Sequence, residues 1–327
     1  MQLIRSLDNL AEAFRHGAVS VGNFDGVHQG HARIVGRLVS RARQAGGPAV
    51  VFTMDPHPAR VLRPADAPPP LTWIDRKAEL LAELGVDAVI AYPTDRAFLD
   101  LDARAFFDEI VRRRLDARAI VEGSNFFFGR GRQGNVALLG DFCRESGVTL
   151  DLVEPVQLDG QVVSSSRVRS LVAAGDVGQA CRMLTRPYRL RGTVVRGAGR
   201  GAGLGYPTAN LAGVSTLLPA EGIYAGRSRA EGTAWPAAIS IGTNPTFDDR
   251  RLKIEVHLIG YRGDLYDRPL EVDLLSRLRA VERFASVEEL LGQMGRDVAA
   301  AQDVAAAQAV AAGCPDREPL SWEEPNP

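Results

Sequence analysis

Two histidines stand three residues apart in the stretch VGNFDGVHQGH, at positions 21–31. His28 and His31 follow a short apolar run and precede a segment with helical spacing, so they fall where a strand ends and a helix begins. Backbone N–H groups at a helix start bind anions, and imidazoles at positions i and i+3 add donors on the same face. The spacing therefore predicts a phosphate site, where charge that builds up on a leaving pyrophosphate is stabilised.

The histidine pair by itself leaves two other interpretations open. The imidazoles can cap the helix or pack against it, or they can form part of a metal site, although no third ligand is evident nearby. The turn GNFDG ahead of them favours the phosphate site. Gly30, between the histidines, lets the backbone approach a phosphate closely.

A second candidate anion site is SSSRVR, at positions 164–169, directly before a helix-like segment. Arg169 suits a triphosphate, because a guanidinium binds phosphate in a bidentate manner. A serine run alone is more often a solvated turn. His57 lies between two prolines in TMDPHP, which stiffens its backbone and by itself predicts a turn with an exposed histidine.

A glycine-rich stretch marks the second half of the chain. GAGRGAGLG places glycine at every second position from 197 to 205, and such a loop can wrap phosphates with backbone N–H groups. No Walker A motif is present, so a kinase here must hold ATP differently. The stretch alone is equally typical of a flexible linker, but PTAN follows it. Pro207 stiffens the segment, and Thr208 and Asn210 offer two neutral oxygen ligands, as Mg²⁺ prefers.

Three glycines also match the dinucleotide-binding pattern G-x-G-x-x-G. They are Gly129, Gly131 and Gly134, and Glu154 follows at the expected distance. The match comes after the fourth strand-like run rather than the first, with a Phe-rich insert before it. We therefore interpret it as a glycine-rich turn and not as the site of a nicotinamide-dependent oxidoreductase.

The first half of the chain alternates between strand-like and helix-like segments. This rhythm predicts a doubly wound parallel sheet covered by helices, with ligands at the carboxyl ends of the strands. The expected strands are AVSVG (18–22), PAVVF (48–52), DAVIAY (87–92), RAIVEG (118–123) and VTLDLVEP (148–155). The expected helices are 30–46, 74–85, 103–115 and 135–147.

The rhythm changes after about residue 185. Short strand-like runs separated by turns predict a small β-barrel. In KIEVHLIG, alternation places Glu255 and His257 on one face of a strand and Ile254, Val256 and Leu258 on the other. A long helix is expected to begin at Ser286, which forms a capping-box signature with Glu289, and to end near Gly313.

The composition is that of an ordinary soluble globular protein. The chain has 327 residues, with 39 basic and 40 acidic side chains, which argues against a general nucleic-acid or membrane-surface binder. Three widely spaced cysteines give no disulfide framework or zinc spacing. The stretch MQLIRSLDNLAEAF lacks the apolar core of a signal peptide, and without an apolar run of about 18 residues we expect no membrane span. We expect a cytoplasmic protein.

Several motifs together resemble one family. GNFDGVHQGH resembles the nucleotidyltransferase motif of bacterial bifunctional riboflavin kinase/FAD synthetases. TMDPHP, GSNFFFGRGRQG (123–134) and SSSRVR resemble further segments of the same half. GAGRGAGLGYPTAN (197–210), GIYAG (222–226), IGTNPTF (241–247) and IEVHLIGY (254–261) resemble the riboflavin kinase module. The matches run in order from residue 20 to about residue 285.

For the first domain, the resemblance implies transfer of AMP from ATP to the phosphate of FMN, giving FAD and pyrophosphate without a protein nucleophile. His28 and His31 match the phosphate-binding histidines and are the expected catalytic residues. The other positions expected to bind ATP there are Gly22, Asn23, Phe24, Asp25, Gly26, Ser164, Ser165, Ser166 and Arg169. Those expected on the flavin side are His57, Asn125, Phe126 and Phe128, although at least one of Phe126, Phe127 and Phe128 is expected in the core.

For the second domain, the resemblance implies phosphorylation of riboflavin by ATP. Glu255 matches the catalytic acid/base position, and Thr208 and Asn210 match the Mg²⁺ ligands. The positions expected to bind ATP are Gly197, Gly199, Arg200, Gly201 and Gly205. Those expected on the flavin side are Tyr224, Asn244, Phe247 and Arg279, with Thr243, Arg277 and Phe284 nearby.

Three residues depart from the family pattern. Phe127 stands where many members have arginine, which puts the binding of the FMN phosphate in question. Ala202 replaces a basic residue in the phosphate loop, and Asp267 alters a turn. Two alternatives therefore stay open: a riboflavin kinase whose nucleotidyltransferase domain is inactive or differently specific, and a flavin-binding regulator without turnover.

The expected organisation is an FMN adenylyltransferase domain at 1–184, a riboflavin kinase domain at 185–314 and a disordered tail at 315–327. The fold class is α/β, with a doubly wound nucleotidyltransferase domain followed by a small β-barrel and a C-terminal helix. The expected partners are riboflavin, FMN, FAD and ATP with Mg²⁺, without nucleic acid or membrane. We expect a monomer or a weak homo-oligomer.

Overall fold

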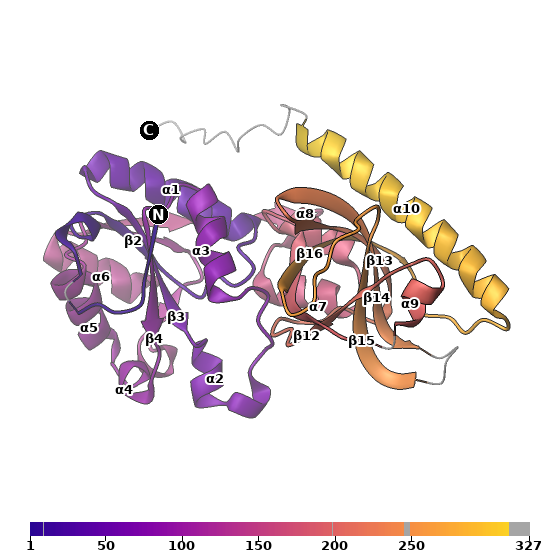
Figure 1. The fold of residues 1–327 in the computed structure, drawn as a ribbon. Coiled ribbons are helices and arrows are strands. Elements are labelled where there is room, and N and C mark those ends of the chain that lie inside the picture. Colours follow the sequence, from indigo (N-terminus) through magenta and orange to yellow (C-terminus); the bar gives the residue numbers. More distant parts are fainter. Residues whose placement is uncertain (9, 198, 245–248, 314–327) are drawn as a thin grey trace. The chain divides into compact units, whose positions relative to one another are not determined.

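The computed structural model describes residues 1–8, 10–197, 199–244 and 249–313. The chain divides into two compact units, one spanning Met1–Ser165 and the other beginning at Ser166. Figure 1 draws the first unit mainly in indigo to magenta. Phe247 and the predicted tail at 315–327 lie outside the described residues.

A parallel sheet with the strand order β1-β4-β3-β2-β5-β8 forms the centre of the first unit (Figure 1). The chain builds outward from β2 through β3 to β4, and then returns to place β5 beside β2. This reversal marks the crevice where such sheets bind ligands, and it confirms the predicted doubly wound sheet. The strands are β1 (Gln2–Ile4), β2 (Ala18–Val21), β3 (Ala49–Asp55), β4 (Ala88–Pro93), β5 (Ala119–Gly123) and β8 (Thr149–Val153).

Apolar side chains on the two faces of this sheet form two cores. Val19 and Phe52 belong to one core and Ala18 and Val51 to the other, because neighbouring strand residues point to opposite faces. The helices α1 (Gln29–Ala45) and α3 (Ile74–Glu83) contribute to the second core. The helices α5 (Ala103–Phe106), η3 (Phe107–Arg114) and α6 (Val136–Ser146) contribute to the first.

Shorter elements connect these layers. They are η1 (Glu12–Phe14), α2 (Pro58–Leu62), η2 (Pro64–Asp66), α4 (Arg96–Leu99), β6 (Phe127–Phe128), η4 (Arg130–Arg132), β7 (Gly134–Asn135), β9 (Gln157–Leu158) and β10 (Gln161–Val162).

Two details of the first unit differ from the sequence prediction. The N-terminal Gln2–Ile4 forms an edge strand beside β4, although three residues are too few to show a period. The expected helix over 103–115 begins as α5 and continues as the π-helical η3, in which Leu115 N–H donates to the carbonyl of Ile110 at 3.0 Å. Phe107 and Ile110 stay buried in this helix, as their spacing predicted.

The second unit is built on a closed antiparallel barrel with the order β11-β12-β15-β14-β13-β16 (Figure 1). This confirms the predicted β-barrel. The strands are β11 (Tyr188–Val195), β12 (Ala209–Ala212), β13 (Gly222–Ala230), β14 (Thr233–Asn244), β15 (Asp249–Leu258) and β16 (Pro269–Arg279). The helices are α7 (Ser165–Ala173), α8 (Val177–Met183), α9 (Arg200–Gly203) and α10 (Val287–Gly313).

The long helix α10 packs against β13, β14 and β16 of the barrel. Its start has the predicted capping contact, since Glu289 N–H donates to the Ser286 hydroxyl at 3.2 Å. The carboxylate of Glu289 reaches back to the Ala285 N–H at 3.1 Å. Arg279 of β16 donates to Asp297 of α10 at 2.8–3.2 Å, and this ion pair fixes the helix to the barrel.

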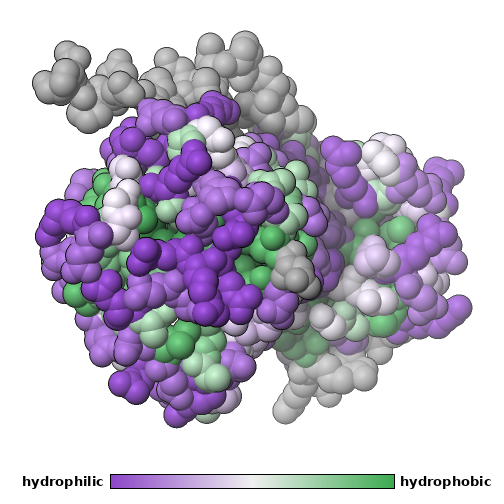
Figure 2. Space-filling model, turned by 90° about the vertical axis from the view of Figure 1, so that its left-hand side faces the viewer, coloured by the Kyte–Doolittle hydropathy of each residue, from purple (hydrophilic) through white to green (hydrophobic). Residues whose placement is uncertain are grey.

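One face of the first unit is mainly polar. Figure 2 shows a face on which hydrophilic residues cover most of the area and hydrophobic residues gather in small patches. Among the described residues, no helix combines the length and the apolar character needed to span a bilayer.

Candidate active sites

The turn between β2 and α1 is buried and strained. Phe24, Asp25, Val27 and His28 are each at most 6% exposed. Phe24 and Val27 have φ values of +45° and +41°, which side-chain-bearing residues rarely adopt. Such conformations persist only where surrounding contacts hold them, and they cluster at functional sites.

Asp25 supplies most of those contacts. Its carboxylate accepts from Leu71 N–H at 3.0 and 3.1 Å, and from the N–H and hydroxyl of Thr72 at 3.1 and 3.2 Å. The Thr72 hydroxyl in turn accepts from Gly26 N–H at 3.2 Å, and the Ser165 hydroxyl donates to the Asp25 carbonyl at 2.9 Å. Two loops distant in sequence therefore hold the turn in place.

His28 is the N-cap of α1. Its Nδ1 accepts from the His31 N–H at 3.3 Å, so in the neutral ring the proton sits on Nε2 and makes that atom a donor. The two imidazoles stack with their centroids 3.6 Å apart. A Cβ at Gly30 would lie 3.1 Å from the His28 ring, which explains the glycine between them.

His31 is a neutral imidazole in this arrangement. Burial lowers its pKa well below the ordinary value of 6.5, and the neighbouring His28 and Lys77 lower it further. Its Nδ1 and the side-chain oxygen of Asn23 are buried and have no hydrogen-bond partner within the part of the chain that the structure describes. Orphaned polar atoms of this kind are costly unless a ligand pairs with them. The turn is therefore suited to a polar ligand.

Glu122 lies at the point where the winding of the sheet reverses, and the sequence analysis missed it. β2 and β5 pair as far as Val19 and Ile120, and beyond this point Glu122 accepts from Val21 N–H at 2.6 Å. The residue is 3% exposed. Burial raises the pKa of this carboxyl well above its usual range, although the Val21 N–H opposes the shift. The only sign of this buried carboxyl in the sequence is that a glutamate stands within an apolar strand.

The residues expected on the flavin side occupy different environments. His57 caps α2, with Nδ1 accepting from Ala59 N–H at 3.1 Å. Asn125 is exposed and Phe126 half-buried, whereas Phe128 belongs to the core, as expected for at least one of these phenylalanines. Phe126 and Phe128 stack with their centroids 5.6 Å apart.

The glycines of the G-x-G-x-x-G match lie in and beside the hairpin of β6 and β7 rather than in a turn from the first strand to a helix. This placement agrees with a glycine-rich turn. On the same hairpin, the exposed Phe127 carries the Arg132 guanidinium over its ring, 4.6 Å from the centroid.

The second signature begins α7. Ser165 contacts the histidine turn as described, and Ser164 directly precedes it. Ser166 and Arg169 belong to the second compact unit, so their approach to the histidines stays a prediction.

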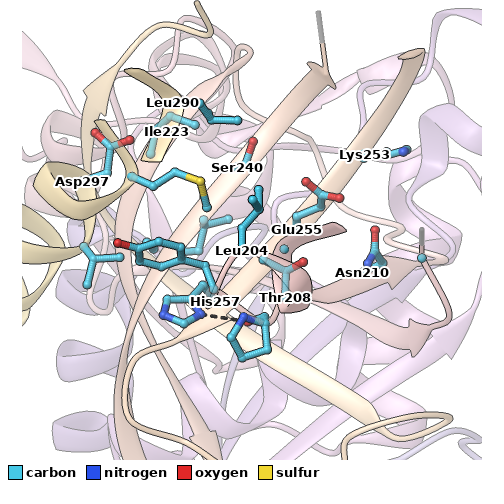
Figure 3. A pocket seen from close by; sticks show the side chains of 18 of the residues that line it. Leu204, Thr208, Asn210, Ile223, Ser240, Lys253, Glu255, His257, Leu290 and Asp297 are labelled. Carbon is cyan, nitrogen blue, oxygen red and sulfur yellow. Dashed lines mark hydrogen bonds between the residues drawn. The ribbon is translucent and has the colours of Figure 1, made fainter. Parts of the chain in front are cut away.

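The barrel unit contains a cavity of about 230 Å³ (Figure 3). It is lined by many of the positions expected from the sequence: Gly197, Gly199, Gly201, Thr208, Asn210, Thr243, Glu255, Arg279 and Phe284. Residues that the sequence analysis did not select also line it, among them Leu204, Ile223, Ser240, Lys253, Leu290 and Asp297. In the view of Figure 3, Thr208, Asn210 and Glu255 lie to one side, and Ile223 and Leu290 to the other.

The polar side of the cavity is assembled from neighbouring strands. Asn210 of β12 is directly opposite Glu255 of β15, and Ser240 of β14 is opposite Glu255 on the other side. Ile254, Val256 and Leu258 are buried in the barrel core, which confirms the predicted alternation.

His257 fixes the segment that carries Thr208. Its Nδ1 lies 2.8 Å from the carbonyl oxygen of Pro207, and because that oxygen only accepts, Nδ1 carries the proton (Figure 3). The Tyr206 ring meets the His257 ring edge-on at 5.6 Å. A Cβ at Gly197 would lie 2.3 Å from the Asn210 amide, so a larger residue here would displace the Asn210 side chain.

Several positions expected near the flavin or ATP do not line the cavity. Tyr224 is fully buried, and its hydroxyl donates to the Ala220 carbonyl at 2.5 Å. Arg277 donates to the Glu221 carbonyl at 2.6 Å, and Gly205 lies outside the lining. Asn244 ends β14 and Arg200 begins α9, but their side chains, like Phe247, are outside the described part of the structure.

The donor set in this cavity fits Mg²⁺. Thr208 and Asn210 offer neutral oxygens beside the Glu255 carboxylate, and Mg²⁺ prefers few protein oxygens together with substrate phosphates. Within the described ranges, no group of three or more His, Cys, Asp or Glu side chains is arranged to hold a metal ion.

Comparisons with known proteins cover both halves of the chain. A family model described as FAD synthetase matches residues 10–167, and one described as riboflavin kinase matches residues 184–305. A bifunctional riboflavin kinase/FMN adenylyltransferase from Pseudomonas fluorescens is 38% identical over 303 residues, covering 92% of this chain and 97% of the relative. The enzyme of that name from Escherichia coli strain K12 is 35% identical over 304 residues, with the same coverage.

A solved structure shares the fold of most of the chain. It is described as a macrolide-efflux protein from Streptococcus pneumoniae, with a TM-score of 0.83 and 28% identity, and the match covers 92% of this chain and 98% of that one. From the full-length relatives and the two family matches, the chain belongs to the bifunctional riboflavin kinase/FMN adenylyltransferase family.

Proposed function

We propose that this chain converts riboflavin to FMN in its barrel unit and FMN to FAD in its parallel-sheet unit, using ATP in both steps. The observation that carries the proposal is that Thr208, Asn210 and Glu255 meet at one cavity, in a chain that also holds a buried histidine turn with unpaired polar atoms. Full-length relatives named for both activities support it.

In the kinase step, the riboflavin hydroxyl oxygen forms a bond to the γ-phosphorus of ATP, the bond from that phosphorus to the β–γ bridging oxygen breaks, and ADP leaves, while Glu255 takes the proton of the hydroxyl. The apolar side of the cavity suits the flavin ring, and Gly197, Gly199 and Gly201 line the cavity, where their backbone N–H groups would bind the phosphates. Thr208 and Asn210 would hold Mg²⁺, which supplies positive charge to the transferred phosphate. His257 acts through the Pro207 carbonyl by keeping this segment in position.

In the adenylyl step, a phosphate oxygen of FMN attacks the α-phosphorus of ATP. A new P–O bond forms, the bond from the α-phosphorus to the bridging oxygen breaks, and pyrophosphate leaves. His28 donates from Nε2 to a phosphate oxygen, and the N–H groups at the start of α1 add to this stabilisation. The other ATP and flavin positions named from the resemblance remain part of this proposal.

The expected boundary between domains at residues 184 and 185 also remains a proposal, as do the cytoplasmic location and the monomeric or weakly associated state. The two compact units are Met1–Ser165 and the residues from Ser166 onward, and the two family matches leave residues 168–183 between them.

The test is to incubate the purified protein with riboflavin, ATP and Mg²⁺ and to separate the three flavins by chromatography over time. We expect FMN first and FAD second. FMN that accumulates without FAD, even when fresh ATP is added, would contradict the adenylyl step and favour a kinase with an inactive or differently specific first domain. Flavin binding without any product would favour a regulator.

A further inference from the structure

The first unit contains a buried positive charge that the proposed steps do not use. Lys77 lies in the first turn of α3 and is 7% exposed. Its ammonium makes one long hydrogen bond, to the Thr53 hydroxyl at 3.4 Å. Among the described residues, no carboxylate lies within ion-pair distance of it.

A buried ammonium without a close carboxylate is unfavourable for folding. Burial lowers the pKa of Lys77, and the more distant Asp25 and Asp55 oppose that shift. Asp25 is not available as a close partner, because its carboxylate already accepts from Leu71 and Thr72. An uncompensated buried charge of this kind is typical of functional sites.

Hydrogen bonds place Lys77 beneath the histidine turn. The Thr53 hydroxyl that it contacts donates to the Asn23 carbonyl at 3.2 Å. The loop that Asp25 anchors, residues 71–72, leads directly into α3. The ammonium also acts on His31, whose pKa it helps to lower. The turn and the start of α3 therefore form one hydrogen-bonded assembly around the lysine.

The same assembly contains His31 Nδ1, a buried nitrogen with no hydrogen-bond partner among the described residues. An anion bound on this turn would face an ammonium below it and the donors of the histidines and the α1 N-terminus beside it. One ammonium together with these donors suits a ligand that carries negative charge.

We propose that Lys77 is a further phosphate-binding residue of the adenylyl site, where its ammonium balances the charge of a phosphate group held on the histidine turn. The inference rests on the proposed adenylyl transfer. The phosphate belongs either to ATP or to FMN, and both present the same chemistry to the lysine.

The test compares Lys77→Met, which keeps length but removes charge, with Lys77→Arg, which keeps charge. Arg76→Met is the matched control, because Arg76 is an equally buried cation on the same helix turn, already paired with Glu79 at 3.1 Å. The riboflavin kinase activity of each variant reports that the protein is folded. Wild-type protein that makes no FAD would contradict the proposed function itself, independently of Lys77.

We expect Lys77→Met to form FAD at least about 100-fold more slowly than the wild type. This is the size of effect seen when one hydrogen-bond donor to the charge that develops in a transition state is removed. Its unfolding temperature without ligand should equal or exceed that of the wild type, because an uncompensated buried charge has been removed. Inorganic pyrophosphate should raise the unfolding temperature of the wild type and of Lys77→Arg, but less that of Lys77→Met. Arg76→Met should keep its response to pyrophosphate.

The kinetic constants identify the phosphate. A raised KM for ATP with a weakened pyrophosphate response assigns Lys77 to the triphosphate, and a raised KM for FMN alone assigns it to the FMN phosphate. FAD formation by Lys77→Met at the wild-type rate would overturn the proposal. The proposal would also be overturned if Lys77→Met unfolded at a lower temperature and this loss of stability accounted for its loss of activity, while stabilisation by pyrophosphate and both KM values stayed unchanged. The lysine would then have a structural role.

Discussion

Asn210 and Glu255 lie directly opposite each other on the antiparallel strands β12 and β15, and both line the barrel cavity. Opposed residues in such a pair have Cβ atoms about 4.5–5.5 Å apart. The pairing of a short strand with a long one therefore brings together the proposed metal-binding oxygen and the proposed proton acceptor. This register sets the geometry of the proposed kinase centre.

Glu255→Gln should lower riboflavin phosphorylation about 10²–10⁴-fold, because the amide keeps the shape of the side chain but takes no proton. When FMN is supplied, FAD should form at the wild-type rate. Chromatography of flavins from parallel reactions with riboflavin and with FMN measures both. Glu271→Gln, which changes a strand carboxylate paired with Arg189 outside the cavity lining, is the control. Loss of both activities in Glu255→Gln would contradict the assignment to one site.

Thr208→Val should raise the Mg²⁺ concentration needed for half-maximal kinase activity. Valine has the shape of threonine but lacks the oxygen, and a loss of about tenfold corresponds to about 1.4 kcal/mol. Magnesium titrations of the kinase reaction at fixed ATP measure the effect. An unchanged titration curve would remove Thr208 from the metal site.

His28→Asn should slow FAD formation about 10²–10³-fold while FMN accumulates. Asparagine remains a good N-cap for α1, so the helix start is preserved, but it lacks the donor that Nε2 provides. His28→Ala, which also loses the cap, should in addition lower the unfolding temperature. FAD formation at the normal rate in His28→Asn would show that the histidine serves only as a cap.

Glu122→Gln should make unfolding less dependent on pH. The raised pKa means that the folded protein favours the protonated carboxyl of Glu122. Protonated Glu122 therefore stabilises the folded state fully below the ordinary pKa of 4.5, and this contribution is lost as the pH rises towards the folded pKa. Glutamine does not titrate and still accepts from the Val21 N–H. The variant should therefore unfold at a higher temperature than the wild type at neutral pH, and the difference should shrink in acid.

Unfolding temperatures from acid to alkaline pH test this prediction. Glu154→Gln, which changes an exposed glutamate near the end of β8, is the control. Parallel curves for wild type and Glu122→Gln across the whole range would contradict the prediction. They would mean that the pKa of Glu122 is the same in the folded and the unfolded protein.

Local pattern was sufficient for the elements and for several side chains. Alternation in KIEVHLIG correctly separated Ile254 and Val256 from Glu255, because side-chain direction in a strand depends only on position. The cap at Ser286 was also predictable, since it involves residues within one helical turn. Tyr224, in contrast, was expected near the flavin and lies fully buried outside the cavity lining, because nothing in GIYAG shows which face of β13 meets the cavity.

The amino-acid sequence by itself determined the two kinds of domain and the order of most strands and helices along the chain, and it predicted phosphate binding at the histidine turn and the glycine loop. Only the tertiary structure decided that Asn210 is opposite Glu255 and that the Glu122 carboxylate accepts from the Val21 N–H of β2. It also decided that Lys77 lies beneath the histidine turn. The physical reason is the range of the interactions. Periodicity, caps and turns act between neighbours in the chain, whereas strand register, burial and charge depend on segments that meet only in the folded protein.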